Sequence, residues 1–426
     1  MSEYDSISKA RELDQDDPLK GYRQQFLIKD TSMIYLDGNS LGRLPKRTVE
    51  YMNLAIQEQW GDRLIRSWNE GWYHQSARLG KKIAQIIGAR PDEVIVSDST
   101  SINLYKLLYG ALKMMEKRSE IISDDMNFPS DLYVMQGLVK QFGQKHTLRL
   151  LKSPDGITSN MTELVRMINR QTAIVSLSHV AFKSSYMYDM DRVTELAHLH
   201  GALVLWDLSH SVGAVPVSLS SANADLAIGC TYKYLNGGPG SPAFLYVRKD
   251  LQEQMENPIQ GWFGEKNPFE FKLNYRESKD IRKFLTGTPP VVSVSGLEPS
   301  LDMILEAGIG AIRQKSVAQT DYLICLAQEW LYKLGFRLGS PEYAEKRGSH
   351  ISLKHAEAYR ICKALIDQRV GNQVVIPDFR EPNNIRLGIT PLYTTFEEIH
   401  TALEQIRYIM VNKIYEKYPR SRDVVT

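Results

Sequence analysis

The sequence predicts an α/β protein with a mostly parallel central sheet, followed by a smaller α+β domain. From about residue 45, helical periodicity alternates with short continuous apolar runs, a pattern typical of parallel strands that are covered on both faces. The pattern changes after Pro289 and Pro290, and 426 residues are enough for two domains. We therefore expect a large domain at 45–290, a small domain at 291–426, and an N-terminal segment at 1–44 that packs with the small domain.

Helices and buried strands alternate in the expected large domain. The predicted helices carry apolar residues at helical spacing, namely Val49, Met52 and Ile56 after Pro45; Leu79, Ile83 and Ile87; Leu104, Leu108 and Leu112; and Val193, Leu196 and Ala197. Continuous apolar runs predict strands at 93–96, 120–123, 173–178, 202–206, 226–230 and 244–247. Because these runs are continuous rather than alternating, we expect the strands to be buried on both faces.

The expected small domain begins with a long helical stretch that ends near Lys333. Short strands are predicted at 335–338, 350–353, 373–376 and 384–389, and helices at 356–368 and from 395 to about 415. This mixed order of short elements is typical of an α+β unit.

Charge and hydropathy exclude several classes of partner. Lys and Arg number 52 against 50 Asp and Glu, and no long basic tract occurs, so we expect neither nucleic acid nor a membrane surface as partner. No apolar run approaches membrane-spanning length, and the polar, acid-rich N-terminus resembles neither a signal peptide nor a transit peptide. We therefore expect a cytoplasmic protein that acts on a small molecule.

The sequence does not indicate a metal site. Cys230, Cys325 and Cys362 are far apart and odd in number, which argues against a disulfide framework and against clustered metal ligands. His198 and His200 stand in an HLHG sequence that is more typical of a helix C-terminal turn.

Lys233 lies in the segment that is most informative about chemistry. A predicted buried strand ends at Thr231, Tyr232 and Lys233, and a glycine-rich turn at 237–240 follows. A lysine at the end of a strand is accessible but can be partly desolvated, which allows its amine to form a Schiff base near neutral pH. A surface lysine in a hairpin loop is the alternative that this segment leaves open.

Asp207 occupies a similar position at the end of another predicted strand, where open α/β sheets bind their ligands. A carboxylate there can pair with a protonated pyridine nitrogen and keep the ring an electron sink. His210 lies on the turn that follows. Asp207 could instead cap a helix, and a lone histidine is more often a structural loop residue, but two such turns ending strands of one sheet favour a cofactor site.

Two further segments supply groups that a cofactor needs. Ser99, Thr100 and Ser101 precede a predicted helix, whose N-terminus with its hydroxyls could bind a phosphate, although ordinary capping explains the same residues. The turn at 127–131 carries Phe128, which could lie flat on a cofactor ring or simply be buried.

Arg386 lies in an apolar strand of the small domain and needs a partner if it is buried. A bidentate substrate carboxylate would be the natural partner, and an internal Asp or Glu is the competing one.

With these residues together, the chain resembles the fold type I pyridoxal phosphate enzymes of the aminotransferase class V kind, and the kynureninase family in particular, over nearly its whole length. The motifs that carry this resemblance are LDGNSLG at 36–42, SINL at 101–104, NFPSDLY at 127–133, WDLSHSVG at 206–213, TYKYLNGGPG at 231–240, GWFG at 261–264 and IRLGITPLY at 385–393. The turns around Asp207 and Lys233 are shared by many relatives, whereas NFPSD, the KYLNGGPG loop and GWFG together are far more specific.

The resemblance implies a role for each candidate residue. Lys233 would hold the cofactor as a Schiff base, Asp207 would pair with the pyridine nitrogen, and Phe128 would stack on the ring. The phosphate would be held by Thr100, Ser101, Tyr232 and Trp262, and the ring substituents would lie near Ser178, His210 and the 129–131 segment, Pro129, Ser130 and Asp131. Arg386 would bind the substrate's α-carboxylate, with Ser40 and Trp68 near its aromatic end.

The resemblance also implies a homodimer with shared active sites, into which Trp262 and Thr288 reach from the partner subunit. Some members carry Asn at the position of Thr288, which leaves the preference for a ring-hydroxylated substrate open. The implied reaction is hydrolysis of L-kynurenine, or of its 3-hydroxy form, to anthranilate, or 3-hydroxyanthranilate, and L-alanine, in tryptophan degradation or NAD precursor synthesis. Lys233 would move the α-proton and Tyr232 would relay protons.

Two other hypotheses remain. A cysteine desulfurase or aminotransferase of the same fold is the nearest, but a desulfurase needs a reactive cysteine on a mobile loop, and the three cysteines fall in predicted helices or a strand. The other is a binding protein that keeps the fold without turnover, which the joint presence of Lys233, Asp207 and Arg386 disfavours.

Overall fold

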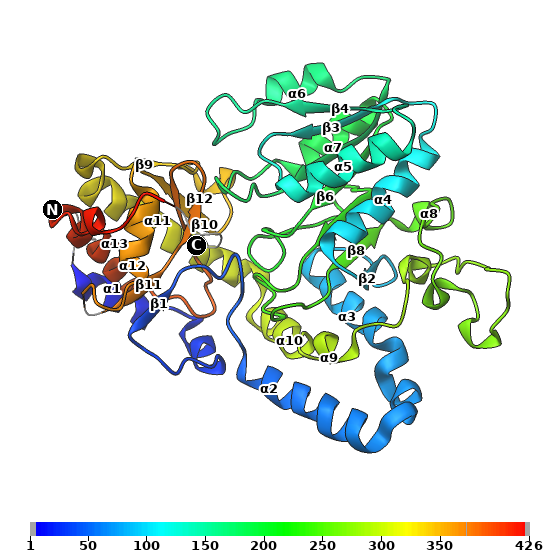
Figure 1. Cartoon of the computed structure of the whole chain (residues 1–426), viewed down its shortest axis with the longest axis horizontal. Helices are drawn as coiled ribbons and strands as arrows, with labels where there is room; N and C mark the ends of the chain where they lie inside the picture. Colours follow the sequence, from blue (N-terminus) through cyan, green and yellow to red (C-terminus); the bar gives the residue numbers. More distant parts are fainter. Residues whose placement is uncertain (1–5, 372, 422–426) are drawn as a thin grey trace.

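The computed structural model describes residues 6–371 and 373–421; the remaining residues of the expected N-terminal segment and small domain lie outside the described part. Two units lie side by side (Figure 1). The larger is built on a seven-stranded sheet and the smaller on a four-stranded antiparallel sheet. The predicted fold class, an α/β protein with a mostly parallel central sheet and a smaller α+β unit, is confirmed.

The seven-stranded sheet has the order β2-β8-β7-β6-β5-β3-β4. Its strands are β2 (Val94–Val96), β3 (Glu120–Asp124), β4 (Thr147–Leu151), β5 (Thr172–Ser178), β6 (Leu203–Asp207), β7 (Leu226–Gly229) and β8 (Phe244–Val247). β8 runs antiparallel to both of its neighbours, and the other adjacent pairs are parallel. The six strands expected in this domain are present; β4 was not indicated, because a half-buried run with an internal arginine lacks a continuous apolar pattern.

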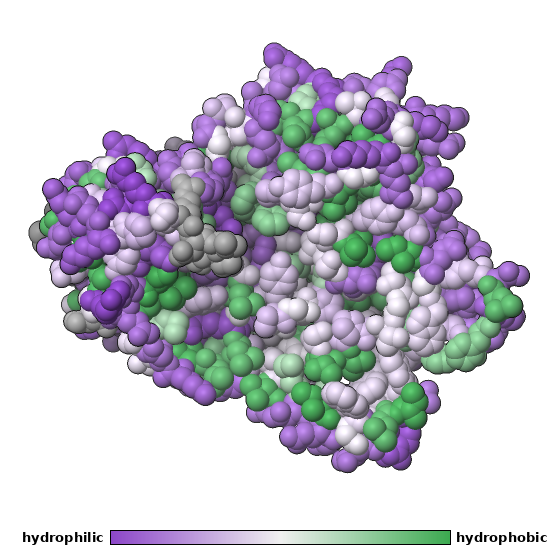
Figure 2. All heavy atoms as spheres, viewed as in Figure 1, coloured by the Kyte–Doolittle hydropathy of each residue, from purple (hydrophilic) through white to green (hydrophobic). Residues whose placement is uncertain are grey.

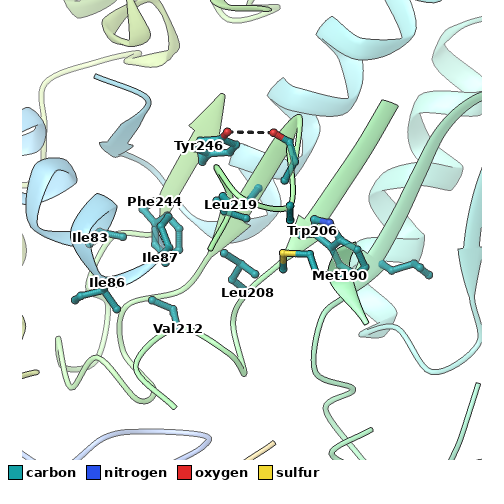
Figure 3. Packing of buried hydrophobic residues seen from close by; sticks show 14 of the residues in the cluster. Ile83, Ile86, Ile87, Met190, Trp206, Leu208, Val212, Leu219, Phe244 and Tyr246 are labelled. Carbon is teal, nitrogen blue, oxygen red and sulfur yellow. Dashed lines mark hydrogen bonds between the residues drawn. The ribbon is translucent and has the colours of Figure 1, made fainter. Parts of the chain in front are cut away.

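Helices cover both faces of this sheet and explain why its strands are continuously apolar. One face packs against α4 (Thr100–Met114) and α5 (Pro129–Gln141), and the other against α3 (Tyr73–Ile86), α6 (Met161–Met167) and α7 (Met190–Leu199). Successive strand residues point to opposite faces, so Ile121 lies in the first cluster and Ile122 in the second. Figure 3 shows part of the second cluster, in which Phe244 packs with residues of α3 and Trp206 lies beside Met190 of α7, and the hydroxyl of Tyr246 donates to the carbonyl of Ala224 at 3.1 Å.

The helix expected after Pro45 is present but changes its geometry. It begins as α2 (Lys46–Asn53) and continues as a π-helical stretch at Leu54–Arg63, which forms the arm at the lower edge of Figure 1. α8 (Lys249–Gln252) follows β8, and the chain from there to α9 (Val291–Ser295) contains short 3₁₀ turns.

The smaller unit combines both ends of the described chain. Its antiparallel sheet has the order β12-β13-β10-β9, and β1 of the N-terminal segment pairs in parallel with β11. Its strands are β1 (Met33–Tyr35), β9 (Arg337–Leu338), β10 (His350–Lys354), β11 (Val374–Ile376), β12 (Asp378–Arg380) and β13 (Asn384–Gly388), and its helices are α1 (Ile7–Gln15), α12 (Ala358–Ile366) and α13 (Phe396–Val411). The side chain of Thr395 accepts from the amide of Glu398 in a capping box that starts α13.

The segment after Pro290 connects the two units. α10 (Glu298–Ala307) places Leu301 and Ile304 in the cluster of the larger unit, and α11 (Ile309–Trp330) runs from Ile312 in that cluster to Trp330 in the cluster of the smaller unit. The domain limits at 45–290 and 291–426 stay a prediction. Across the described ranges, no helix is long and apolar enough to cross a membrane.

Candidate active site

The carboxyl ends of neighbouring parallel strands bring the candidate residues together. Ser178 ends β5 and Asp207 ends β6, and the two residues lie opposite each other in the sheet. β7 leads into Lys233, and β3 leads into Phe128. A cavity of about 220 Å³ lies at this edge; of the candidates, Ser40, Thr100, Ser101, Phe128, Ser130, Asp131, Ser178, Asp207, His210, Tyr232, Lys233 and Arg386 line it.

Lys233 is a cavity lysine rather than a surface lysine in a hairpin. It is half-buried, and its Nζ lies 3.0 Å from Nε2 of His210. Burial, together with the charge of Lys233, holds the pKa of His210 well below its usual range. The imidazole beside the amine is therefore neutral at physiological pH.

Two carboxyl groups near Lys233 differ in environment. Oδ1 of Asp207 accepts the backbone N–H of Ser209 at 2.8 Å, and the hydroxyl of Ser178 lies 3.4 Å from Oδ2. Asp207 is thus held in the turn after β6 and does not cap a helix. Asp131 is buried in the first turn of α5, where desolvation and then the charge of Asp207 raise its pKa well above the ordinary value. The surroundings of Asp131 therefore favour its protonated form.

Hydroxyl groups at the starts of the helices α4 and α5 form another part of the cavity wall. Ser99 is the N-cap of α4, and its side chain accepts from the amide of Ile102. Ser99 thus satisfies the cap, while Thr100 and Ser101 line the cavity. The hydroxyl of Ser101 lies 2.9 Å from that of Ser130, in the first turn of α5. Two helix N-termini with their hydroxyls are suited to bind a phosphate.

Phe128 presents its ring to the cavity instead of being buried. Its side chain is 41% exposed, and its ring packs edge-on against Phe182, with ring centroids 5.2 Å apart. The Nζ of Lys233 lies 5.9 Å from the ring centroid of Phe128. The ring can therefore lie against a planar group held at Lys233.

Arg386 of β13 is buried and lines the same cavity. Its Nη1 donates to the carbonyl of Phe182 at 2.7 Å and its Nη2 to the hydroxyl of Ser40 at 2.6 Å. It also forms an ion pair with Asp378, and Asp37 lies 3.8 Å away. The internal carboxylate that the sequence left open as a partner is therefore present, and the arginine still faces the cavity.

Four candidate residues do not line this cavity within one chain. Pro129 is the first residue of α5. Trp68 packs against Trp72 and Phe263, Trp262 packs against Phe263 and is 39% exposed, and Thr288 is exposed.

Three residues that the sequence did not single out also line the cavity, namely Phe182, Ser209 and Arg380. Ser209 stands inside the WDLSHSVG motif, which was a usable signal. Phe182 and Arg380 lie in a loop and in a three-residue strand, where no pattern marks them.

Gly42 joins the N-terminal segment to the loop of Lys233. Its amide donates to the carbonyl of Tyr232 at 2.8 Å, and a Cβ at this position would clash with the carbonyl of Lys233 and with Asn236. Such close approach of two backbones requires glycine.

The groups around the cavity fit pyridoxal phosphate. An amine, a carboxylate, an exposed aromatic face and hydroxyls at two helix N-termini are the donors that its aldehyde, pyridine nitrogen, ring and phosphate require. By contrast, no group of three or more His, Cys, Asp or Glu residues within 6–371 and 373–421 could hold a metal ion. His198, considered above as a ligand, pairs instead with Asp225 at 2.8 Å.

Fold and site together define a pyridoxal phosphate enzyme of fold type I. A kynureninase from Pseudomonas fluorescens is 45% identical over 408 residues, covering 95% of this chain and 95% of the relative. The chain belongs to the kynureninase family. A kynureninase from Burkholderia mallei (strain SAVP1) is 43% identical over 407 residues, covering 94% of this chain and 95% of the relative, and residues 312–406 match the family model "Kynureninase C-terminal domain".

Solved structures of lower identity share the fold. A cysteine desulfurase from Thermococcus onnurineus NA1 superposes with a TM-score of 0.77 at 19% identity, covering 94% of this chain and 98% of that chain. A C-DES mutant with glycine covalently linked to its PLP cofactor superposes with a TM-score of 0.77 at 18% identity, covering 90% and 98%.

The cysteines of this chain do not suit desulfuration. Cys325 lies in α11 and Cys362 in α12, and burial raises the pKa of the Cys230 thiol at the end of β7. A buried thiol with a raised pKa is a poor nucleophile.

Proposed function

We propose that this protein is a pyridoxal phosphate-dependent hydrolase that cleaves L-kynurenine, and its 3-hydroxy form, to anthranilate, or 3-hydroxyanthranilate, and L-alanine. The observation that carries the proposal is a single cavity in which Lys233 and Asp207 lie at the sheet edge and Arg386 approaches from the smaller unit. Family membership supports the choice of substrate. The reaction would serve tryptophan degradation or the synthesis of NAD precursors.

The cavity residues bind and orient the substrate and the cofactor. Arg386 binds the α-carboxylate of the substrate, with the hydroxyl of Ser40 beside it. Asp207 would pair with the pyridine nitrogen, Phe128 would lie against the ring, and Thr100 and Ser101 would bind the phosphate. When bound at Lys233, pyridoxal phosphate supplies an electron sink for bonds that break at the amino acid.

Lys233 and Tyr232 move the protons. Once the incoming substrate amine has freed Lys233, its Nζ would take the α-proton of the substrate, and the neutral His210 at 3.0 Å would hold the amine in place. Water adds to the γ-carbonyl before the Cβ–Cγ bond breaks, so that Cγ leaves as the carboxylate of anthranilate and Cβ takes a proton. Burial raises the pKa of Tyr232, which keeps its phenol protonated and able to relay that proton.

The functional unit in this proposal is a homodimer with shared active sites. Large apolar side chains are exposed on the arm after α2, including Trp60, Leu64 and Ile65, and Figure 2 shows apolar residues along this lower edge. Exposed apolar surface of this kind is typical of an interface. A second cavity of about 450 Å³ adjoins the proposed phosphate site through Thr100, Ser101 and Tyr232, and would give a partner subunit access to it. In the dimer, Trp262 and Thr288 would complete the partner's site, and Trp68 would lie near the aromatic end of the substrate.

We also propose a reducing, cytoplasmic location. The three cysteines are unpaired in the structure, and free cysteines are typical of proteins from reducing compartments.

One assay tests the reaction. Purified holoenzyme is incubated with L-kynurenine, and anthranilate is followed by its fluorescence; we expect turnover that Lys233→Ala abolishes together with the visible absorbance of the bound cofactor. Formation of sulfide or pyruvate from other amino acids without anthranilate would support a desulfurase or aminotransferase. Binding without turnover of any amino acid would support a sensor that only retains the fold.

A further inference from the structure

Asp378 is shared by two arginines at the substrate end of the cavity. Asp378 of β12 lies opposite Arg386 of β13 in the antiparallel pair, and the two side chains form an ion pair. Arg380 lies two residues further along β12, so its side chain emerges on the same face as that of Asp378. Its Nε is 2.9 Å from Oδ2 of Asp378. One carboxylate therefore contacts two guanidinium groups.

The Arg386 guanidinium already has several partners within the protein. Its nitrogens donate to the hydroxyl of Ser40 and to the carbonyl of Phe182, and Asp378 pairs with the same Nη2 that contacts Ser40. Arg386 and Asp378 are almost fully buried, with 1% and 6% of their side-chain surface exposed. An incoming carboxylate at Arg386 therefore meets a resident carboxylate, and like charges at such a short distance in a partly desolvated site repel strongly.

The side chain of Arg380 is more exposed than that of Arg386. Its side chain is 34% exposed, it lines the cavity, and its described ionic partner is Asp378. It can therefore follow Asp378 if that carboxylate moves away from Arg386. Asp37, 3.8 Å from Arg386, is the second carboxylate of this cluster, so two arginines balance two carboxylates before a substrate binds.

We propose that Asp378 competes with the substrate carboxylate for Arg386, and that Arg380 weakens this competition by holding Asp378. Arg380 is thus a positioning residue that sets the affinity for carboxylate ligands through Asp378 without contacting the ligand itself. This inference rests on the proposed function, in which Arg386 binds the α-carboxylate. The proposed competition explains why a charged, half-buried arginine, Arg380, stands in the cavity wall.

A double-mutant cycle tests the competition. Arg380→Gln leaves Asp378 with Arg386 alone, so KM for L-kynurenine rises about tenfold while kcat changes less than about twofold. Asp378→Asn removes the competing charge, so Arg380→Gln introduced into the Asp378→Asn background raises KM less than about twofold. Arg380→Lys keeps a cation beside Asp378 and recovers most of the affinity. If Arg380 instead contacts the substrate, its loss costs the same in both backgrounds, which would overturn the proposal.

Ligand binding provides a readout that does not depend on turnover. L-alanine and L-alaninamide are titrated into each holoenzyme and followed by calorimetry and by the visible absorbance of the cofactor. Arg380→Gln should weaken L-alanine about tenfold and leave L-alaninamide unchanged, because the amide carries no negative charge. Equal weakening of both ligands would contradict a carboxylate-specific effect.

The control is Arg369→Gln, which breaks an ion pair of the same kind with Asp367 in an exposed turn of the smaller unit. It should change neither KM nor the affinity for L-alanine, and far-UV circular dichroism and thermal melting check that every variant is folded. Failure of the wild type to release anthranilate would reject the proposed function. A wild type that does release it, with an Arg380→Gln defect that Asp378→Asn does not suppress, would reject this inference alone.

Discussion

The Nζ of Lys233 lies 3.0 Å from the Nε2 of His210, and the two residues come from turns that follow adjacent strands of the sheet. The imidazole is buried, and its pKa is held well below the usual range by burial and then by the lysine. A neutral imidazole orients the amine without adding a second positive charge to the cavity.

Replacement of His210 should therefore disturb the orientation of the lysine amine without removing a titration from the pH profile of kcat. His210→Phe fills the volume but removes the polar contact, and we expect kcat to fall about 10- to 100-fold because the amine loses its orientation. Because the pKa of the histidine lies well below its usual range, the shape of the kcat profile above pH 6 should stay the same. Steady-state rates from pH 6 to 9 check this, and loss of a limb near pH 7 in the variant would contradict a neutral histidine.

Asp207 and Asp131 should respond differently to the same substitution. Asp131→Asn replaces a carboxyl group whose raised pKa already keeps it neutral, so we expect less than about a tenfold loss of kcat/KM. In the proposed mechanism, Asp207→Asn removes the charge that would pair with the pyridine nitrogen, so we expect a loss of about 10²- to 10⁴-fold. Kinetics with L-kynurenine compare the two variants, and the reverse order would show that the two carboxyl groups have been assigned the wrong charges.

Asp37 should make stability depend on pH. Burial, and then the charge of Asp378, raise the pKa of Asp37 to about 6, so the fold favours its protonated form. This stabilisation is complete below pH 4 and is lost as the pH rises through 6, by a total of about 1–3 kcal/mol. Asp37→Asn, which resembles the neutral acid, should therefore unfold at higher urea than the wild type at pH 8, with an advantage that shrinks as the pH falls from 6 to 4.

Urea titrations at pH 4.5, 6 and 8 measure that difference. Asp30→Asn is a control of opposite sign: contacts with Ser32 lower the pKa of its exposed carboxylate, so this variant should gain no stability over the wild type at pH 8. An advantage of Asp37→Asn that is the same at all three pH values would contradict titration of Asp37.

Mixed dimers should regain activity if the sites are shared. Lys233→Ala and Trp262→Ala subunits are each expected to be nearly inactive as homodimers. After equal mixing and exchange, about half of the dimers are mixed and each has one intact site of two, so about a quarter of the wild-type activity should return. Anthranilate release after exchange in mild denaturant measures this. Equal mixtures that stay inactive, although light scattering shows dimers, would place both residues in one subunit's site.

The sequence predicted the central sheet well because its signals are local. Six continuous apolar runs became β2, β3, β5, β6, β7 and β8, and the serine before α4 became its N-cap. β4 escaped detection because it lacks a continuous apolar pattern, and β1 and β12 because three residues are too few to show one. Their residues carry no pattern of their own.

The site could be predicted where strand ends determine it. Asp207 and Lys233 follow buried strands, so their meeting at one edge follows from parallel pairing. The sequence could not show whether Arg386 pairs with a substrate carboxylate or with an internal one. Asp378 lies opposite Arg386 through an antiparallel register that the sequence does not encode locally. Arg380 and Phe182 were missed because a three-residue strand and a loop carry no pattern that marks them.

The pairing of β1 with β11 joins residues 33–35 to residues 374–376. During synthesis the ribosome releases the N-terminal segment more than 300 residues before its strand partner exists. The larger unit can form its sheet meanwhile, because all seven strands lie between residues 94 and 247. Any chain that stops short of residue 374 leaves β1 with an unpaired edge, so premature termination should yield a product that aggregates rather than a smaller working enzyme.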